Sequence, residues 1–283
     1  MKSVKTFVQD KQKEYLNGWS NDSQSILDKG LYEWMVSQLD PNHQRVLEIG
    51  CGVGNSTLAL LKSGKKLISV DENYYCIEHT RKLIEMNGFK VLTINDRLDR
   101  KLDGAFYATN VKHKSLPNAK TVFEEFDCLL IQSDILQDLK LVEYFKECEI
   151  ESIICWLIGT HGAKWFDSNL DGWVKSAMDY RLKVQNTVYE ISDEILKEGG
   201  VLNIIDRSLY LNEEELKNLI INHKDQASVT KLIVSDKVNQ IEFGTPSTNG
   251  VGMVKQMSRD TNFEKTQEEL WLHSVNVYKK RAE

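Results

Sequence analysis

Short apolar runs alternate with helical patterns through most of the chain. The runs at 46–49, 66–70, 126–131, 150–158 and 197–205 have the length and composition of buried strands. Amphipathic stretches that predict helices lie between them, at 58–63, 74–86, 136–148 and 184–197. Beyond them the pattern predicts a helix at 211–222, strands near 229–235 and 250–256, and an amphipathic helix at 262–280.

The amino-terminal segment predicts two further helices. Residues 3–19 place apolar side chains among lysines at helical spacing, and this helix is expected to end near Gly18. The second helix is expected to begin at a polar cap within residues 21–23 and to end before Pro41.

A glycine-rich turn follows the first predicted strand. Residues 46–57 have the sequence VLEIGCGVGNST, in which an apolar run breaks into three glycines and then into a helical pattern. Glycine permits positive φ and lets a ligand approach the backbone, and Asn55 or Ser56 is expected to cap the helix. A dinucleotide fingerprint, GxGxxG, would place its third glycine at Asn55, whereas the chain carries ExGxGxG from Glu48 to Gly54.

Two acids follow the second predicted strand, 66–70. They are Asp71 and Glu72. A carboxylate at the end of this strand can accept hydrogen bonds from both hydroxyls of a ribose. The glycine turn and the acid together resemble the class I S-adenosylmethionine-dependent methyltransferases. The resemblance is specific over residues 46–72 and weaker out to about residue 208.

The resemblance implies a doubly wound, mostly parallel α/β sheet of seven strands, the Rossmann-like methyltransferase fold. It implies S-adenosyl-L-methionine as cofactor and S-adenosyl-L-homocysteine as product. In this family the glycine turn passes beneath the methionine part, the acid binds the ribose, and amino-terminal helices often lie over the cofactor. The residues expected to bind the cofactor are Glu48, Gly50, Cys51, Gly52, Gly54, Asn55, Ser56, Asp71, Glu72, Asp134, Ile135, Leu136 and Trp156.

The whole chain, 1–283, is expected to form a single methyltransferase domain. Amino-terminal helices would occupy 1–43, the core 44–260 and a carboxy-terminal helix 261–283. The core would contain an inserted hairpin at about 89–120 and an aromatic insert at about 162–184. In the hairpin, residues 90–95 would pair with 105–112 across a link that contains the turn signal Asp103-Gly104.

Asp96 and Asp134 compete for the adenine end of the cofactor, because each follows a predicted strand. Counting back from the strand at 197–205, which the family places fifth, makes 126–131 the third strand of the core. This favours Asp134, whose family role is to accept a hydrogen bond from the adenine amino group. Asp134 is also suited to cap the helix at 136–148, and the two roles are compatible.

The fourth predicted strand ends in the sequence WLIGTHG, which brings Thr160 and His161 to the edge where ligands bind in such sheets. Methyl transfer from a sulfonium needs an aligned acceptor, and it needs a base only where the acceptor carries a proton. His161 is the candidate base, with a structural role as the alternative. Tyr15, Trp19, Thr160 and Trp165 are candidate acceptor-binding residues. A core position is the favoured alternative for Tyr15 and Trp19, and a small satellite core is an equal alternative for the insert that contains Trp165.

The composition is that of a globular protein, with 28% charged and 41% hydrophobic residues. The net charge of -6 disfavours nonspecific attraction to nucleic acid or to anionic membranes. Five cysteines without a CxxC pair favour neither a zinc site nor a disulfide framework, so no metal is expected. Neither a signal peptide nor a membrane-spanning run is expected, which predicts a soluble, cytoplasmic protein.

The preferred function is methyl transfer to an oxygen or nitrogen of a small molecule. The chain lacks both the (D/N/S)PP(Y/F/W) motif of exocyclic-amine DNA methyltransferases and any Pro-Cys pair. Methylation of a protein or RNA is the first alternative, because residues 97–120 carry six basic and two acidic residues. The basic residues of this segment are Arg97, Arg100, Lys101, Lys112, Lys114 and Lys120. The second alternative is a non-catalytic sensor or scaffold subunit that binds the cofactor. The sequence leaves the oligomeric state open.

Overall fold

The computed structural model describes residues 3–170, 174–245, 250, 254–256, 263–265 and 269–281. Within them, the central sheet has eight strands in the order β3-β6-β2-β1-β7-β8-β12-β9. From β3 to β8 all neighbours are parallel, and β12 is antiparallel to both β8 and β9. The strands are β1 Arg45–Ile49, β2 Lys66–Asp71, β3 Val91–Ile94, β6 Cys128–Gln132, β7 Ser152–Trp156, β8 Val201–Ser208, β9 Ile233–Gly244 and β12 Leu270–Tyr278.

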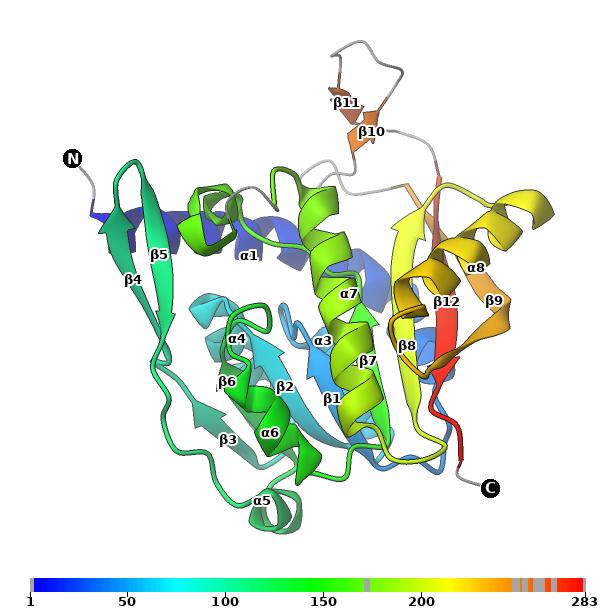
Figure 1. Cartoon of the computed structure of the whole chain (residues 1–283), viewed down its shortest axis with the longest axis horizontal. Coiled ribbons are helices and arrows are strands. Elements are labelled where there is room, and N and C mark those ends of the chain that lie inside the picture. The colour runs from blue at the N-terminus through cyan, green and yellow to red at the C-terminus, as the bar shows by residue number, and fades with distance from the viewer. Residues whose placement is uncertain are drawn as a thin grey trace.

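Helices cover both faces of the sheet, and a long helix crosses its edge (Figure 1). One face carries α2 Leu31–Val36, α3 Asn55–Lys62 and α4 Tyr74–Met86. The other face carries α5 Ala119–Glu125, α6 Lys140–Lys146, α7 Ala177–Ile195 and α8 Glu213–Ala227. Helix α1, Val4–Asp28, lies across the edge at which the parallel strands end (Figure 1).

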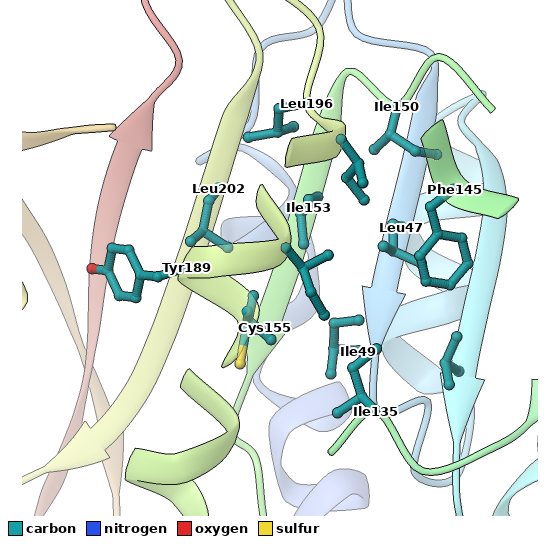
Figure 2. Packing of buried hydrophobic residues seen from close by; sticks show 14 of the residues in the cluster. Leu47, Ile49, Ile135, Phe145, Ile150, Ile153, Cys155, Tyr189, Leu196 and Leu202 are labelled. Atoms are coloured by element: carbon teal, nitrogen blue, oxygen red, sulfur yellow. The ribbon is translucent and has the colours of Figure 1, made fainter. Parts of the chain in front are cut away.

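The alternation of side chains along each strand explains why both faces need a helical cover. On β1, Val46 and Leu47 are both fully buried, yet they belong to separate apolar clusters on opposite faces. Figure 2 shows one of these clusters, in which Leu47 and Leu202 on the sheet lie near Phe145 of α6 and Tyr189 of α7. Because the strands are apolar on both sides, a sheet with one exposed face would leave half of these residues in water.

The predicted third, fourth and fifth core strands are confirmed as β6, β7 and β8, and the doubly wound α/β class is confirmed with them. The predicted count of seven strands falls one short, because residues 91–94 form an additional edge strand, β3, parallel to β6. The prediction that these residues pair with 105–112 is therefore wrong.

The inserted hairpin consists of β4, Leu98–Asp103, and β5, Phe106–Val111. Asp103 pairs with Phe106, so the loop contains only two residues, and Gly104 takes a positive φ of 60°. Such a short loop requires strands to flank it directly. The strand partner of β5 is consequently the charged stretch that the sequence had suggested as a link.

Two predictions about the amino-terminal helices are wrong. Helix α1 runs without interruption through Gly18 and continues to Asp28. Residues 21–23 lie inside it, and the break comes at Gly30, which has a φ of 66°. Packing explains the continuity, because Ser23 is buried and its hydroxyl lies 2.6 Å from that of Tyr32 on α2.

The carboxy-terminal prediction of a helix at 262–280 is also wrong, because β12 occupies Leu270–Tyr278. The sequence also predicts a strand near 250–256, but the strand that joins the sheet beside β8 is β12. Of that earlier stretch, Val254–Gln256 forms β10, which pairs with β11, Phe263–Lys265, and residues 251–253 lie outside the described residues. None of the described helices is long and apolar enough to cross a membrane.

Candidate active site

A cavity of about 70 Å³ lies at the carboxyl edge of the sheet, where the tips of β1, β2, β6 and β7 meet helix α1. Many of the predicted site residues line it: Tyr15, Trp19, Gly50, Gly52, Asp71, Glu72, Asp134, Ile135, Trp156, Thr160 and His161. Others lie outside its wall: Glu48, Cys51, Gly54, Asn55, Ser56, Leu136 and Trp165. Sequence reasoning missed further lining residues: Ile49, Val70, Asn73, Ser133, Leu157, Ile158, Gly159, Tyr180 and Val184.

The glycine turn is packed tightly from two directions. Gly52 and Gly54 both have positive φ, at 53° and 86°. A Cβ atom at Gly54 would lie 2.9 Å from Cα of Thr80, so this glycine allows α4 to approach the turn. A Cβ atom at Gly52 would lie 2.5 Å from Nε1 of Trp19, so this glycine allows α1 to approach. Two of the three motif glycines are thus required by close packing as well as by backbone conformation.

Glu48 braces the turn from beneath rather than facing the cavity. Its buried carboxylate accepts hydrogen bonds from the hydroxyls of Ser56 at 2.6 Å, Thr57 at 2.7 Å and Ser69 at 2.8 Å. Burial raises the pKa of Glu48, and the three hydroxyl donors oppose that rise. These bonds join β1, β2 and α3, so the acid of the ExGxGxG motif holds the turn in shape.

The predicted caps of α3 are wrong. Gly54 is the N-cap residue, in the left-handed conformation, and no side chain bonds to the first amides of the helix. Ser56 donates to Glu48 instead, and Asn55 donates through Nδ2 to the Ser23 hydroxyl of α1 at 3.0 Å. The start of α3 is therefore tied to α1 by a side-chain hydrogen bond.

Asp71 faces the glycine turn. Its Oδ2 accepts a hydrogen bond from the amide of Gly52 at 3.1 Å, and its Oδ1 accepts one from the amide of Asn73 at 2.8 Å. Burial raises the pKa of Asp71 to about 7, although both amide donors lower it. This carboxylate consequently changes its charge near neutral pH.

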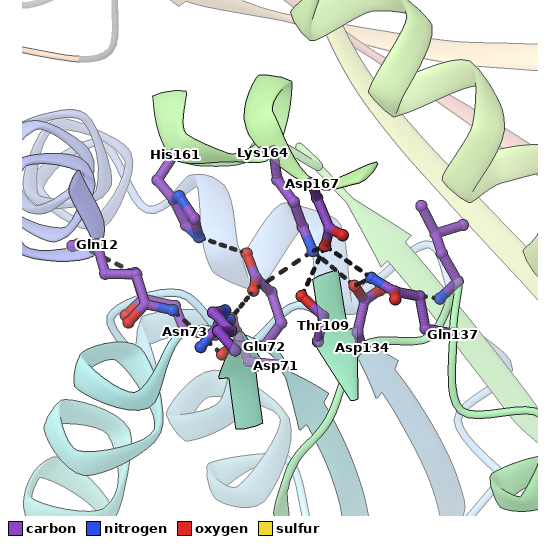
Figure 3. Close-up of polar contacts among 12 residues, drawn as sticks. Gln12, Asp71, Glu72, Asn73, Thr109, Asp134, Gln137, His161, Lys164 and Asp167 are labelled. Carbon is purple, nitrogen blue, oxygen red and sulfur yellow. Dashed lines mark hydrogen bonds and ion pairs between the residues drawn. The ribbon is translucent and has the colours of Figure 1, made fainter. Parts of the chain in front are cut away.

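Glu72 faces a buried group of charges on the other side (Figure 3). Its Oε1 lies 2.7 Å from Nε2 of His161, and its Oε2 accepts a hydrogen bond from Arg100 at 2.7 Å and lies 3.5 Å from Nζ of Lys164. Burial alone would raise the pKa of Glu72, but His161, Lys164 and Arg100 together hold it well below its ordinary range. Glu72 is therefore a firmly ionised acid.

Lys164 is the member of this group that the sequence pattern gave no reason to select. It is 1% exposed, and its ammonium lies 2.5 Å from Oδ2 of Asp134 and 3.8 Å from Asp167. Burial lowers the pKa of Lys164, but Asp134 and Glu72 raise it well above the ordinary value. A buried ammonium with three carboxylates around it remains charged.

Asp134, rather than Asp96, lies at the cavity. Its Oδ1 accepts a hydrogen bond from the amide of Leu136, and its Oδ2 accepts one from Nε2 of Gln137 at 2.7 Å. The predicted cap on a following helix is wrong, because α6 begins only at Lys140 and Asp134 closes the turn before it. Asp96 is exposed, lies 3.6 Å from Lys114 and lines a separate cavity beside the hairpin.

Thr160 and His161 come from the segment that follows β7. His161 is 2% exposed, and its Nδ1 and the Thr160 hydroxyl are buried without a hydrogen-bond partner among the described residues. Trp156 is fixed from its other end, where its indole N–H donates to Oδ1 of Asn203 at 2.5 Å. Trp165 packs against the apolar core on the α7 side instead of lining the cavity.

Comparison with known proteins agrees with the position of the glycine turn. Residues 22–109 match the family model of the methyltransferase small domain, and this segment contains the turn and both acids. No curated protein matches the sequence.

Solved structures of related shape include three methyltransferases. Precorrin-6y C5,15-methyltransferase from Geobacter metallireducens GS-15 has a TM-score of 0.43 and 10% identity, over 88% of this chain and 87% of that one. A putative methyltransferase from Bacillus halodurans C-125 has a TM-score of 0.44 and 13% identity, over 87% and 98%. An rRNA methylase from Streptococcus thermophilus has a TM-score of 0.40 and 14% identity, over 88% and 94%.

The family match covers residues 22–109, less than half of the chain, and the glycine turn and the strands β1 and β2 lie within it.

Proposed function

We propose that the protein transfers a methyl group from S-adenosyl-L-methionine to an oxygen or nitrogen of a small molecule. The observation that carries this proposal is the position of Asp71 beside Gly52, where the carboxylate accepts the glycine amide at 3.1 Å and both residues line one cavity. An ionised carboxylate is suited to accept hydrogen bonds from a ribose. A glycine beside it leaves room for the chain that continues from the ribose.

The other lining residues fit the remaining parts of the cofactor. The Asp134 carboxylate would accept a hydrogen bond from the adenine amino group, and Ile135 offers an apolar contact to the ring. Gly50 and Gly52 would hold the methionine part through their backbone, with Trp156 in the neighbouring wall. When bound, the cofactor supplies a methyl group on a positively charged sulfur.

The chemistry left to the protein is alignment of the acceptor, exclusion of water and removal of a proton. The buried Nδ1 of His161 and the hydroxyl of Thr160 are two polar atoms available to an O–H or N–H acceptor. In this mechanism the acceptor proton passes to Nδ1 of His161, whose Nε2 lies 2.7 Å from Oε1 of Glu72. The unpartnered Nδ1 favours an enzyme over a sensor that only binds the cofactor.

Two features favour a small acceptor over a macromolecule. Helix α1 and the short helical turn Gly162–Phe166 bring Trp19, His161 and Lys164 around the site. Two of the six basic residues of the hairpin segment are also used inside the protein, because Arg97 pairs with Asp138 and Arg100 with Glu72. A basic surface that would hold RNA is correspondingly reduced.

Calorimetric titration with S-adenosyl-L-methionine and S-adenosyl-L-homocysteine tests the cofactor. We expect micromolar or tighter binding that Asp71→Ala reduces by tenfold or more, whereas Asp96→Ala, at the exposed competing acid, leaves binding unchanged. Absence of binding to either compound would refute the proposal.

Transfer of a radiolabelled methyl group to a panel of small hydroxyl and amine compounds then tests the reaction. His161→Ala should abolish transfer while it preserves S-adenosyl-L-homocysteine binding. Unchanged transfer by this variant would exclude His161 as the base, and label found only on added RNA or protein would exclude the small acceptor.

A further inference from the structure

Helix α1 places two aromatic side chains directly against the glycines of the site. A Cβ atom at Gly52 would lie 2.5 Å from Nε1 of Trp19, and one at Gly159 would lie 2.6 Å from the hydroxyl oxygen of Tyr15. Both distances are shorter than ordinary contacts with a Cβ atom. Tyr15 and Trp19 therefore fill the space beside two segments, the turn after β1 and the residues after β7.

The volume of the cavity shows the consequence of this packing. It measures about 70 Å³ in the structure. Pockets that hold cofactors and similar ligands typically measure about 300–1,000 Å³. A molecule that contains both an adenosine and an amino-acid chain is too large for the present space. The side chains of Tyr15 and Trp19 bound this space on the α1 side.

We propose that α1 is an internal plug of the cofactor site, whose Tyr15 and Trp19 must withdraw from Gly159 and Gly52 before S-adenosylmethionine binds. The inference rests on the proposed function in that it takes S-adenosylmethionine as the ligand. Displacement of the plug costs free energy, so the apparent affinity is lower than that of an open site and the association is slower.

The contacts of α1 show how the plug is held. Asn73 donates through Nδ2 to the backbone carbonyl of Gln12 at 3.1 Å, and the Gln12 amide donates to the carbonyl of Glu72 at 3.4 Å. These bonds attach α1 to the loop that carries both site acids. The first part of the helix packs on a small apolar cluster, in which Val8 meets Tyr107 and Ala163. Tyr15 and Trp19 themselves pack against the larger apolar cluster on the α2–α4 face of the sheet, so their withdrawal costs more free energy than the opening of the first turns of the helix.

Titration of the full-length protein with S-adenosyl-L-homocysteine, by calorimetry and stopped-flow fluorescence, tests the plug. We expect Trp19→Ala to have an affinity and an association rate constant for S-adenosyl-L-homocysteine that are both at least tenfold higher than those of wild type. Gln12→Ala should accelerate association to a smaller extent, because it removes the side-chain bond to the Glu72 carbonyl without changing the cavity wall, while the bond from Asn73 to the Gln12 backbone remains. Trp34→Ala is the matched control, since Trp34 is a half-buried tryptophan of α2 that does not line the cavity.

The outcomes separate this inference from the proposed function. Binding by wild type with equal or weaker binding by Trp19→Ala overturns the plug and leaves the cofactor assignment standing. Binding by Trp19→Ala where wild type does not bind supports both, whereas no binding by any of the proteins overturns both.

A second measurement covers the case in which Trp19→Ala does not fold. Wild-type protein labelled with 5-fluorotryptophan gives a fluorine resonance for Trp19, which Trp19→Phe identifies. Saturation with S-adenosyl-L-homocysteine should move this resonance to a solvent-exposed position. An unmoved, shielded resonance in the saturated protein would overturn the plug.

Discussion

Asp71 and Glu72 are neighbours at the end of β2, yet their carboxylates face different parts of the site. Oδ2 of Asp71 accepts a hydrogen bond from the Gly52 amide at 3.1 Å, whereas Oε1 of Glu72 lies 2.7 Å from Nε2 of His161. Burial raises the pKa of Asp71 to about 7, and the surrounding cations hold the pKa of Glu72 well below its ordinary range. The contributions of the two acids to the stability of the fold should therefore change with pH in opposite directions.

Cofactor affinity should rise as the pH increases from 5 to 8. Asp71 ionises near pH 7, and only the ionised carboxylate accepts hydrogen bonds from both ribose hydroxyls. Calorimetric titration with S-adenosyl-L-homocysteine across this range measures the effect. Asp71→Asn should bind about tenfold more weakly at pH 8 and lose the pH dependence assigned to this group. Parallel pH curves for wild type and Asp71→Asn would contradict the assignment.

The raised pKa of Asp71 also has a consequence for stability. The folded protein binds this proton more tightly than the unfolded chain, whose ordinary pKa is 3.8. The resulting stabilisation is fully present below pH 3.8 and is lost as the pH rises through about 7. Urea denaturation should accordingly show that wild type loses stability relative to Asp71→Asn between pH 5 and pH 8. A constant difference between the two proteins would count against the raised pKa.

Glu72 should show the opposite dependence. Its lowered pKa contributes stability above the ordinary glutamate value of 4.5, and this contribution is lost as the pH falls through the still lower folded value. We expect Glu72→Gln to be about 3–5 kcal/mol less stable than wild type at pH 7, because it breaks a buried charge group, and to approach wild type as the pH falls below 4.5. Urea denaturation at several pH values measures both quantities.

Glu143→Gln is the control for this experiment, because Glu143 pairs with Lys146 at 2.8 Å with its side chain 75% exposed. This variant should follow wild type at every pH. A stability difference between wild type and Glu72→Gln that does not change with pH would show that Glu72 is not held ionised.

The parts of the site that sequence predicts are those built within one short segment. The turn at Gly50–Gly54 and the acid Asp71 each follow directly from a strand that stops and a helix that starts. The buried charge group is different, because it joins Glu72, Arg100 and Lys164 from segments far apart in the sequence. Lysines are almost always found at the protein surface, and no local sequence pattern indicates that Lys164 is buried.

The elements that sequence mispredicts are those decided by distant partners. Residues 270–278 place apolar side chains at spacings compatible with a helix or a strand, and pairing with both β8 and β9 decides for the strand. Residues 91–94 are a second case, because their parallel pairing with β6 makes them an edge strand of the sheet. The hairpin differs, since its two-residue loop at Gly104 was visible in the sequence and only the strand beside it was missed.

Close packing at the glycine turn makes a prediction with a matched control. Gly54 and Gly88 have nearly the same φ, 86° and 85°, but a Cβ atom would meet Thr80 at Gly54 and nothing within 4 Å at Gly88. We expect Gly88→Ala to lose about 1–2 kcal/mol of stability, from the left-handed backbone alone, and Gly54→Ala to lose about 1–3 kcal/mol more. Urea denaturation measures both. Equal losses would mean that α4 yields to the added methyl group.

A buried ion pair anchors the hairpin to the core. Removal of this ion pair should lower the stability of the protein more than removal of an exposed charge on the hairpin. Arg97 is 2% exposed and pairs with the buried Asp138, which also accepts the Ser133 hydroxyl at 2.6 Å beside the cavity wall. We expect Arg97→Met to lose about 3–5 kcal/mol in urea denaturation, because Asp138 is left without its cation, while Lys101→Met on the exposed side of β4 is unchanged. The double variant Arg97→Met, Asp138→Leu should recover much of the loss, since two apolar side chains can replace a buried pair. A double variant whose loss equals the sum of the two single losses would show that the two side chains act independently.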